Sequence, residues 1–177
     1  TANNWLKSDF LRKFLFLSVF CMPFSAWAFP VDAYLDAGYA ENGRVSAALN
    51  QSEFSIESAV LQTDGKLVVA GTIQIATNDT DGLLVRYNTD GSIDTGFGIS
   101  GKVTAALSSN IDAFHALTVQ TDGKLLVAGS SCNWINGNDC GDINVIVARY
   151  TSGGLLDTTF GAGGIVSMDT APAAYKE

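Results

Sequence analysis

Short apolar stretches alternate with stretches rich in Gly, Asp, Asn and Ser through most of the chain after residue 28. Apolar runs of this length, bounded by turn-forming residues and lacking a helical period, are typical of β-strands. In the best-defined part of the chain the pattern predicts four strands, at residues 102–107, 115–121, 124–129 and 144–151. The predicted fold class is therefore all-β.

Two of these strands differ in their hydrophobic pattern. The stretch 125–128 (LLVA) is apolar at consecutive positions, so both faces of that strand must be covered. The stretch 102–105 (KVTA) alternates between polar and apolar residues and is expected nearer the exposed rim. A small four-stranded antiparallel sheet that is covered on both faces by copies of itself is a β-propeller blade.

An Asp-Gly pair follows the strand at 115–121, and an equivalent pair occurs earlier in the chain. Asp122-Gly123 and Asp64-Gly65 both have apolar residues on each side. A two-residue hairpin turn of the favoured hand needs positive φ, which Gly and Asp tolerate. We therefore expect a tight β-hairpin at each pair.

The chain also repeats itself at long range. The decapeptide QTDGKLVVAG at 62–71 returns as QTDGKLLVAG at 120–129, 58 positions later with one substitution. A second block occurs three times, as LDAGYAENGRV at 35–45, IDTGFGISGKV at 93–103 and LDTTFGAGGIV at 156–166. Between the last two copies the spacing grows to 63 residues, and the extra residues fall in SSCNWINGNDCGD, which we expect to be a loop.

These motifs resemble the delta-60 repeat, a bacterial family assigned to the β-propeller fold. The resemblance covers about residues 32–168. It implies a repeat segment at 29–168, divided into a partial repeat (29–45), two repeats (46–103 and 104–166) and a tail (169–177). A closed propeller takes roughly 4 to 8 blades, so these repeats form an incomplete ring. We expect further repeats of the same chain, or other copies of it, to cover the open blade faces.

The repeated Asp and aromatic positions allow two interpretations. They are either a repeated ligand site or a structural unit, in which Asp accepts backbone N–H groups in a turn and the aromatic ring fills the seam between blades. Nearby glycines mark a tight turn, which favours the structural interpretation. The predicted repeat-structural residues are Asp36, Tyr39, Asp64, Gly65, Asp94, Phe97, Asp122, Gly123, Asp157 and Phe160.

The N-terminus has the three regions of a secretory signal. The basic residues Arg12 and Lys13 precede an apolar run, and the small-residue region Ala26-Trp27-Ala28 follows it. We therefore predict a signal peptide at 1–28 and an exported protein that is secreted, periplasmic or at the cell surface. The apolar run is too short for a membrane-spanning helix, which takes about 20 residues, so no integral membrane anchor is expected.

The predicted mature chain is strongly acidic. Removing Lys7, Asp9, Arg12 and Lys13 with the signal leaves 7 basic and 17 acidic residues, a net charge of −10. Nucleic-acid binding relies on clustered Lys and Arg, which this chain lacks. Nucleic acid is therefore not expected as a partner, whereas a glycan or a protein at the cell surface remains open.

Residues suited to catalysis are few. His115 is the sole histidine and aligns with Glu57 of the preceding repeat, so it is not a repeated ligand. The chain has no nucleophile elbow, His pair or phosphate loop. We therefore predict a non-catalytic structural or binding module without a cofactor. The alternative is a propeller hydrolase or lyase that uses Asp112, His115 and Glu57 at the central channel.

Two cysteines lie in the inserted segment. With Cys21 removed in the signal, Cys132 and Cys140 remain as a pair in a protein bound for an oxidising compartment, which favours a disulfide. Two free thiols or part of a metal site are the alternatives. The loops 78–82 and 136–142 are rich in oxygen ligands but lack a full calcium-loop spacing, so no metal site is predicted and weak calcium binding is left open.

Overall fold

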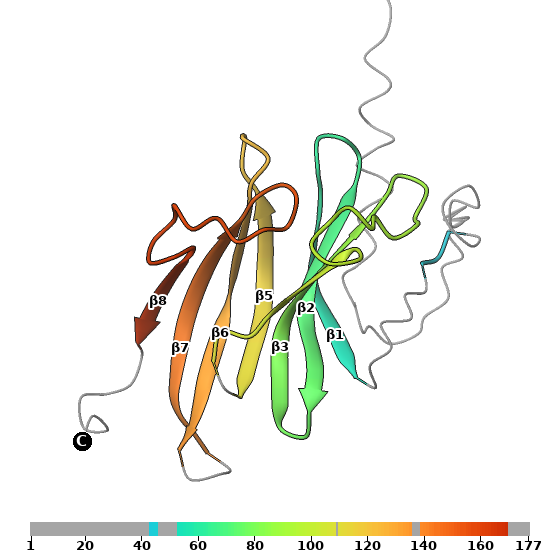
Figure 1. The fold of residues 1–177 in the computed structure, drawn as a ribbon. Helices are drawn as coiled ribbons and strands as arrows, with labels where there is room; N and C mark the ends of the chain where they lie inside the picture. Colours follow the sequence, from blue (N-terminus) through green and yellow to red (C-terminus); the bar gives the residue numbers. More distant parts are fainter. Residues whose placement is uncertain (1–42, 46–52, 109, 136–138, 170–177) are drawn as a thin grey trace, which may run out of the picture. The chain divides into compact units, whose positions relative to one another are not determined.

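The computed structural model describes residues 43–45, 53–108, 110–135 and 139–169 (Figure 1). These residues belong to one compact unit within Tyr34–Glu177. They form eight β-strands and no helix. The strands are β1 (Phe54–Leu61), β2 (Leu67–Ala76), β3 (Asp79–Tyr87), β4 (Lys102–Ala105), β5 (Ile111–Val119), β6 (Leu125–Ile135), β7 (Asp139–Tyr150) and β8 (Ile165–Asp169).

Some predictions concern parts of the chain outside the described residues. These are the signal peptide at 1–28, the tail at 170–177 and the repeat-structural residues Asp36 and Tyr39. Within the described part of the chain, no helix is long and apolar enough to cross a membrane.

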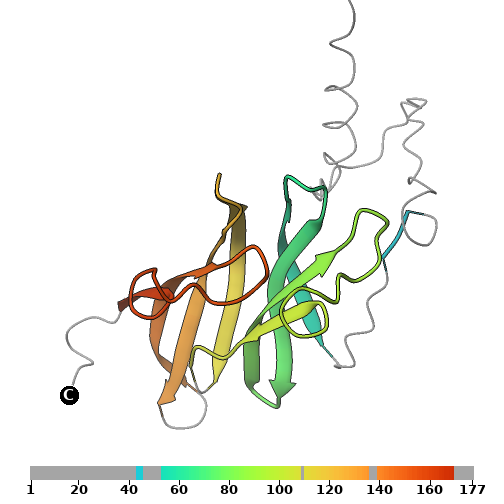
Figure 2. The same ribbon diagram turned by 45° about the horizontal axis from the view of Figure 1, so that its top comes forward.

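The eight strands form two antiparallel blades of four strands each. In blade 1 the order is β1-β2-β3-β4, and in blade 2 it is β5-β6-β7-β8. One parallel bridge, Thr80 with Ile111, joins the blades, and the sheet is not closed (Figure 2). The predicted fold, all-β propeller-type blades in an incomplete ring, is confirmed.

The prediction that residues 102–107 start a new blade was wrong. Strand β4 pairs antiparallel with β3, with Val103 opposite Leu84, so it is the outermost strand of blade 1. Strand β8 pairs with β7 in the same way. The order follows from the loop at 93–101, which turns the chain back along the strand it has just left. Across the blades, strand β5 contacts β1, β2 and β3 of blade 1.

The hairpins after β1 and β5 form as predicted, but their turns are wider. Strand β5 ends at Val119 and β6 begins at Leu125, and the Gln120 amide donates to the Lys124 carbonyl at 2.8 Å. Gly123 has a φ of 82°, whereas Asp122 does not have positive φ. Asp122 instead accepts a hydrogen bond from the Lys124 amide at 3.1 Å. A turn with only its glycine at positive φ replaces the expected two-residue turn.

The inserted segment had been predicted to be a loop, but most of it lengthens the two strands of a hairpin. Strands β6 and β7 have 11 and 12 residues, whereas their counterparts β2 and β3 have 10 and 9. Both strands of this hairpin therefore extend beyond the common repeat, and residues 136–138 at its tip lie outside the described residues.

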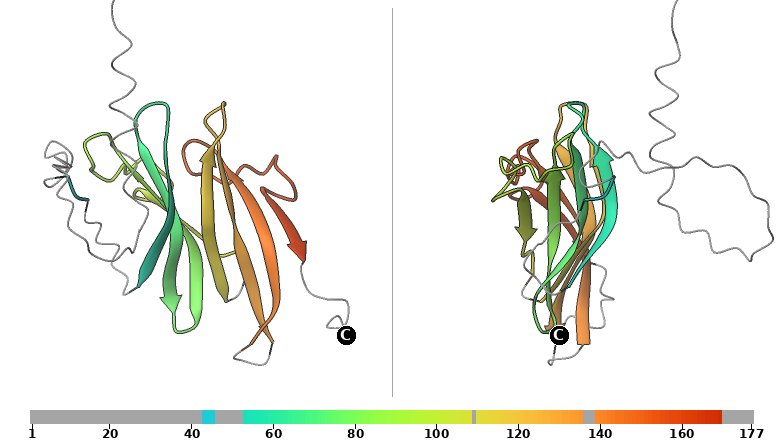
Figure 3. Two further views of the ribbon diagram at one scale, coloured as in Figure 1. Left: turned by 180° about the vertical axis from the view of Figure 1, so that it is seen from behind. Right: turned by 90° about the vertical axis from the view of Figure 1, so that its right-hand side faces the viewer.

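The main core lies between the two blades. Blade 1 contributes Val68, Ala70 and Leu84 to it, and blade 2 contributes Phe114, Leu125, Val127, Ile146, Ala148 and Tyr150. A second cluster, Val69, Ile73, Leu83, Val85 and Tyr87, covers the opposite face of blade 1. The consecutive apolar residues of β2 thus divide between two buried faces, as predicted. Figure 3 shows β1 and β8 at opposite ends of this array of strands.

Candidate functional site

The repeated aspartates each hold two basic side chains of their own blade. In blade 1, Asp94 Oδ2 lies 2.7 Å from Lys66 Nζ and 2.8 Å from Arg86 Nε. In blade 2, Asp157 Oδ2 lies 3.1 Å from Lys124 Nζ and 2.8 Å from Arg149 Nε. Each arginine also lies over the repeated aromatic ring, 4.7 Å from the centroids of Phe97 and Phe160.

These contacts change the ionisation of both carboxyl groups. The hydrogen bond from Lys66 is the main cause that holds the pKa of Asp94 below its ordinary value. Hydrogen bonds from the side chains of Thr159 and Lys124 hold the pKa of Asp157 well below its ordinary value. Both aspartates are therefore charged at neutral pH.

In blade 1 this cluster also reaches the neighbouring blade. Arg86 Nη1 donates to the Ser152 carbonyl, and the Gly98 amide donates to the Gly153 carbonyl at 2.9 Å. Phe97 is fully buried, and a Cβ on Gly154 would lie 2.9 Å from its ring. The repeated Asp and aromatic residues thus take part in blade-to-blade packing.

Sequence reasoning missed the basic partners in this arrangement. The Lys of the decapeptide and the Arg before the β3 and β7 tyrosines recur in register with the Asp block, and this shared spacing was the available signal. The predicted turn residues Asp64, Gly65, Asp122 and Gly123 lie in the β1–β2 and β5–β6 hairpins. In both hairpins the Asp side chain accepts the amide of the following Lys.

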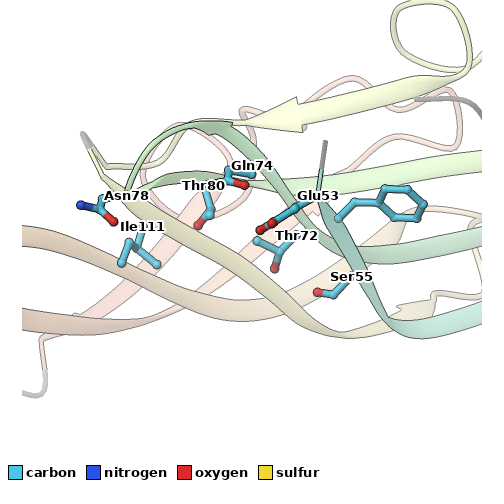
Figure 4. Close-up of a pocket in the computed structure, with 8 residues that line it drawn as sticks. Glu53, Ser55, Thr72, Gln74, Asn78, Thr80 and Ile111 are labelled. Atoms are coloured by element: carbon cyan, nitrogen blue, oxygen red, sulfur yellow. The ribbon is translucent and has the colours of Figure 1, made fainter. Parts of the chain in front are cut away.

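A groove of about 410 Å³ lies where the β2–β3 turn meets the start of β5. Figure 4 shows Asn78 and Ile111 at one end of the groove and Ser55 and Thr72 at the other. Seven of the eight lining residues come from blade 1. The lining residues are Glu53, Phe54, Ser55, Thr72, Gln74, Asn78, Thr80 and Ile111.

Three of the polar side chains that line this groove are not repeated in blade 2. The repeat spacing places Ala113 at the position of Ser55, Cys132 at that of Gln74 and Ile143 at that of Thr80. Ser130 keeps the hydroxyl group at the position of Thr72, but blade 2 lacks the hydroxyl groups of Ser55 and Thr80 and the amide of Gln74. Side chains confined to one blade are not explained by the needs of blade packing, which makes the groove the best candidate for a specific site.

The three predicted catalytic candidates are not joined by any described hydrogen bond or ion pair. Glu57 and His115 occupy the bulge positions of β1 and β5, where the register with the next strand shifts, and both are exposed. His115 Nε2 lies 3.1 Å from Ser130 Oγ. A bulge frees its residue from the ladder, which explains why these two aligned positions differ in chemistry.

Asp112 is fully buried and positions a backbone segment. Its Oδ2 accepts hydrogen bonds from the amides of Leu107, at 2.5 Å, and Ser108, at 2.8 Å, so it fixes the chain between the blades.

Burial raises the pKa of Asp81, and the charges of Asp79 and Asp112 raise it further. Among the described residues, no group of three or more His, Cys, Asp or Glu could hold a metal ion.

The two cysteines lie on paired strands. Cys132 is buried in β6 opposite Ile143, and Cys140 lies in β7 opposite Trp134. Both cysteines therefore lie on the extended β6–β7 hairpin, whereas the sequence analysis had placed them in a loop. Their disulfide stays a prediction, since the side chain of Cys140 lies outside the described residues.

Comparison with known families agrees with this architecture. Residues 62–97 and 120–160 match a domain of unknown function, DUF5122, described as a beta-propeller. The two matched segments coincide with the repeated blocks and include both Asp clusters. No curated protein matches the chain. The chain is thus similar to a propeller repeat family, and the narrower delta-60 assignment stays a prediction.

Proposed function

We propose that this chain is a non-catalytic, exported propeller-repeat module that binds a glycan in the groove of blade 1. The groove lining carries this proposal. Gln74 and Asn78 supply amide donors and acceptors, and Ser55, Thr72 and Thr80 supply hydroxyl groups. Sugar hydroxyls both donate and accept hydrogen bonds, so such a lining suits them.

An aromatic residue complements these polar groups. Phe54 lines the groove and is 48% exposed, so its ring is available to pack against the C–H face of a sugar. Glu53 adds a single carboxylate that can accept from a hydroxyl group. An apolar surface beside a few placed polar groups is the usual composition of a small-molecule site.

The same lining supports a binding role over catalysis. Glycoside hydrolysis uses two carboxyl groups on either side of the bond, and Glu53 is the one carboxylate among the groove residues. The alternative, a hydrolase or lyase, requires Asp112, His115 and Glu57 to act together. Asp112 instead accepts two backbone amides, and His115 contacts Ser130.

Calorimetric titration with soluble hexasaccharides of glucose, N-acetylglucosamine and galacturonate tests this function. We expect one of these sugars to bind, and Phe54→Ala and Gln74→Ala to weaken that binding by roughly tenfold or more, a loss of about 1.4 kcal/mol. Thr104 is an exposed residue of β4 that does not line the groove, so Thr104→Ala is the matched control and should bind normally.

Two outcomes would contradict the proposal. Absence of binding to all three sugars would remove the glycan role. Release of shorter sugars that stops in His115→Ala or Asp112→Asn would support the enzyme instead. Export is tested separately, by mass spectrometry of the protein from a bacterial host, where a mature chain starting at Phe29 is expected.

A further inference from the structure

The groove of blade 1 has a negative charge in its lining and no positive charge among the residues described there. Glu53 lines the groove, and none of the other described lining residues is Lys, Arg or His. Glu53 is exposed, so a ligand can reach its carboxylate. In Figure 4 this carboxylate lies near the middle of the lining, between Asn78 at one end and Ser55 at the other. A ligand that fills the groove therefore meets Glu53.

Three further acidic residues adjoin the lining. Thr80 lines the groove and stands between Asp79 and Asp81 in β3. Ile111 also lines the groove and directly precedes Asp112 in β5. The Thr80 hydroxyl group donates to the Asp112 carbonyl at 3.2 Å, which holds the two strands together at this point. Both strands that form this end of the groove thus carry carboxyl groups beside their lining residues.

No basic side chain pairs with these acidic residues in the part of the chain that the structure describes. The ion pairs found there use Asp94, Asp122 and Asp157 instead. Asp112 Oδ1 is buried and has no hydrogen-bond partner. A charge in the protein interior is screened less than a charge at the surface, so its field reaches further. The negative charge at this end of the groove is therefore uncompensated.

The three aspartates act on one another. Burial is the main cause that raises the pKa of Asp81, and the charges of Asp79 and Asp112 are the next causes. A like charge raises the pKa of a carboxyl group because it disfavours the ionised form. A positively charged ligand group would relieve this repulsion, whereas a negatively charged one would increase it. The charge around the groove thus favours cationic ligands over anionic ones.

We propose that the groove binds an oligosaccharide with free amino groups, such as a glucosamine oligomer, in preference to neutral or acidic sugars. This inference rests on the proposed glycan function and names the class of glycan. A charged amino group donates to the Glu53 carboxylate, while the Phe54 ring packs on the sugar and the Gln74 amide bonds its hydroxyl groups. A uronate brings its own carboxylate toward Glu53, and this repulsion selects against acidic sugars.

Calorimetric titration with two matched hexasaccharides tests the preference. The ligands are the hexamers of glucosamine and of N-acetylglucosamine, at about pH 5.5, where amino groups are protonated and ordinary carboxyl groups are ionised. We expect the glucosamine hexamer to bind roughly tenfold or more tightly, because hydrogen bonds between charged groups are about twice as strong as neutral ones. Added salt should reduce the difference, because it screens the attraction between exposed charges.

Two variants assign the preference to the groove. Glu53→Gln removes the charge and keeps the size of the side chain. It should weaken binding of the glucosamine hexamer roughly tenfold and leave binding of the N-acetylglucosamine hexamer within about twofold. Asp64→Asn is the matched control, because Asp64 is an exposed acid of the β1–β2 hairpin that does not line the groove. It should keep the full preference, and near-ultraviolet circular dichroism verifies that both variants are folded.

The outcomes separate this inference from the glycan function itself. Equal affinity for the two hexamers, or a preference that persists in Glu53→Gln, would overturn the amino-sugar assignment while the glycan function stands. Absence of binding to every sugar would remove both. Hexalysine is the probe for a basic peptide. If it binds as tightly as the glucosamine hexamer and with the same dependence on Glu53, the groove recognises cations in general and the amino-sugar assignment is wrong.

Discussion

Blade 1 and blade 2 have nearly the same decapeptide but different surroundings. Val68 and Ala70 of blade 1 are fully buried against blade 2, whereas their counterparts Leu126 and Ala128 are only half-buried. Leu125 and Val127, from the other face of the same strand, are fully buried. Burial in this protein therefore depends on which blade lies next to a face, and not on the local sequence of that face.

The polar cluster shows the same difference. In both blades the Asp, Lys and Arg groups contact each other within the blade. In blade 1 the arginine also bonds the next blade, and Phe97 beneath it is fully buried, whereas Phe160 is half-buried. The cluster is thus an intra-blade unit that becomes an inter-blade contact when a neighbour is present.

Removing the aromatic ring between the blades should have the largest effect on stability. Phe114→Ala is expected to lower the free energy of unfolding by about 3–5 kcal/mol, because it empties a fully buried site in the inter-blade core. Ile56→Ala, at the exposed counterpart, should cost about 1 kcal/mol or less. Urea denaturation at low protein concentration measures both, and equal losses would contradict the asymmetry between the blades.

The two repeated arginines should show the next largest difference in their contribution to the free energy of unfolding. Arg86→Ala is expected to cost about 2–3 kcal/mol, since it leaves the buried Asp94 with one partner fewer and removes the bond to Ser152. Arg149→Ala should cost about 1 kcal/mol, since its bonds lie within one blade and nearer solvent. Urea denaturation of the two variants is again the measurement. A larger loss for Arg149→Ala would mean that the bond across the blades stabilises little.

Substitution of the glycine at the inter-blade contact should have a smaller effect on stability. Gly82→Ala should cost about 1–3 kcal/mol, because the new Cβ would meet the Phe114 ring and force it to shift. Val145→Ala, the same position in blade 2, should stay within about 0.5 kcal/mol in the monomer. Thermal unfolding followed by circular dichroism compares them, and an unchanged melting temperature for Gly82→Ala would show that the seam is loosely packed.

The acid dependence should show the smallest effect, and the effect should have the same direction in both blades. The folded state lowers the pKa of Asp94 and of Asp157, so each carboxylate stabilises the fold fully above its unfolded pKa of about 4. That contribution is lost as the pH falls through the folded pKa. Asp94→Asn and Asp157→Asn should each make stability fall less steeply below about pH 4. Urea midpoints measured across this pH range test the slopes, and a normal acid slope in both variants would contradict these pairs.

Most of the strands of this protein were predictable from the sequence, but some pairings were not. The apolar run of β6 and the spacing of the decapeptide predicted blades covered on both faces. The hydrophobic pattern of β4 was also recognised, yet it was assigned to the wrong blade. A short alternating strand has no signal for its partner, which is set by the loop at 93–101 that returns it to β3.

The candidate site was less predictable. Asp94 and Phe97 were recognised because they recur, and their basic partners recur as well, but contact between Lys66 and Asp94 crosses 28 positions of sequence. The groove could not be predicted, because its residues come from β1, β2, β3 and β5 and share no motif. Only folding brings these separate polar side chains to one place.

The sequence by itself determined the all-β class, the repeat and the apolar residues on both faces of each blade. These follow from local periodicity and from turn residues, which act within a few positions of the chain. The tertiary structure decided which of those faces is covered, where β4 pairs and which side chains line the groove. Burial and long-range pairing depend on neighbours distant in sequence, so they are properties of the packed blades and not of any single stretch.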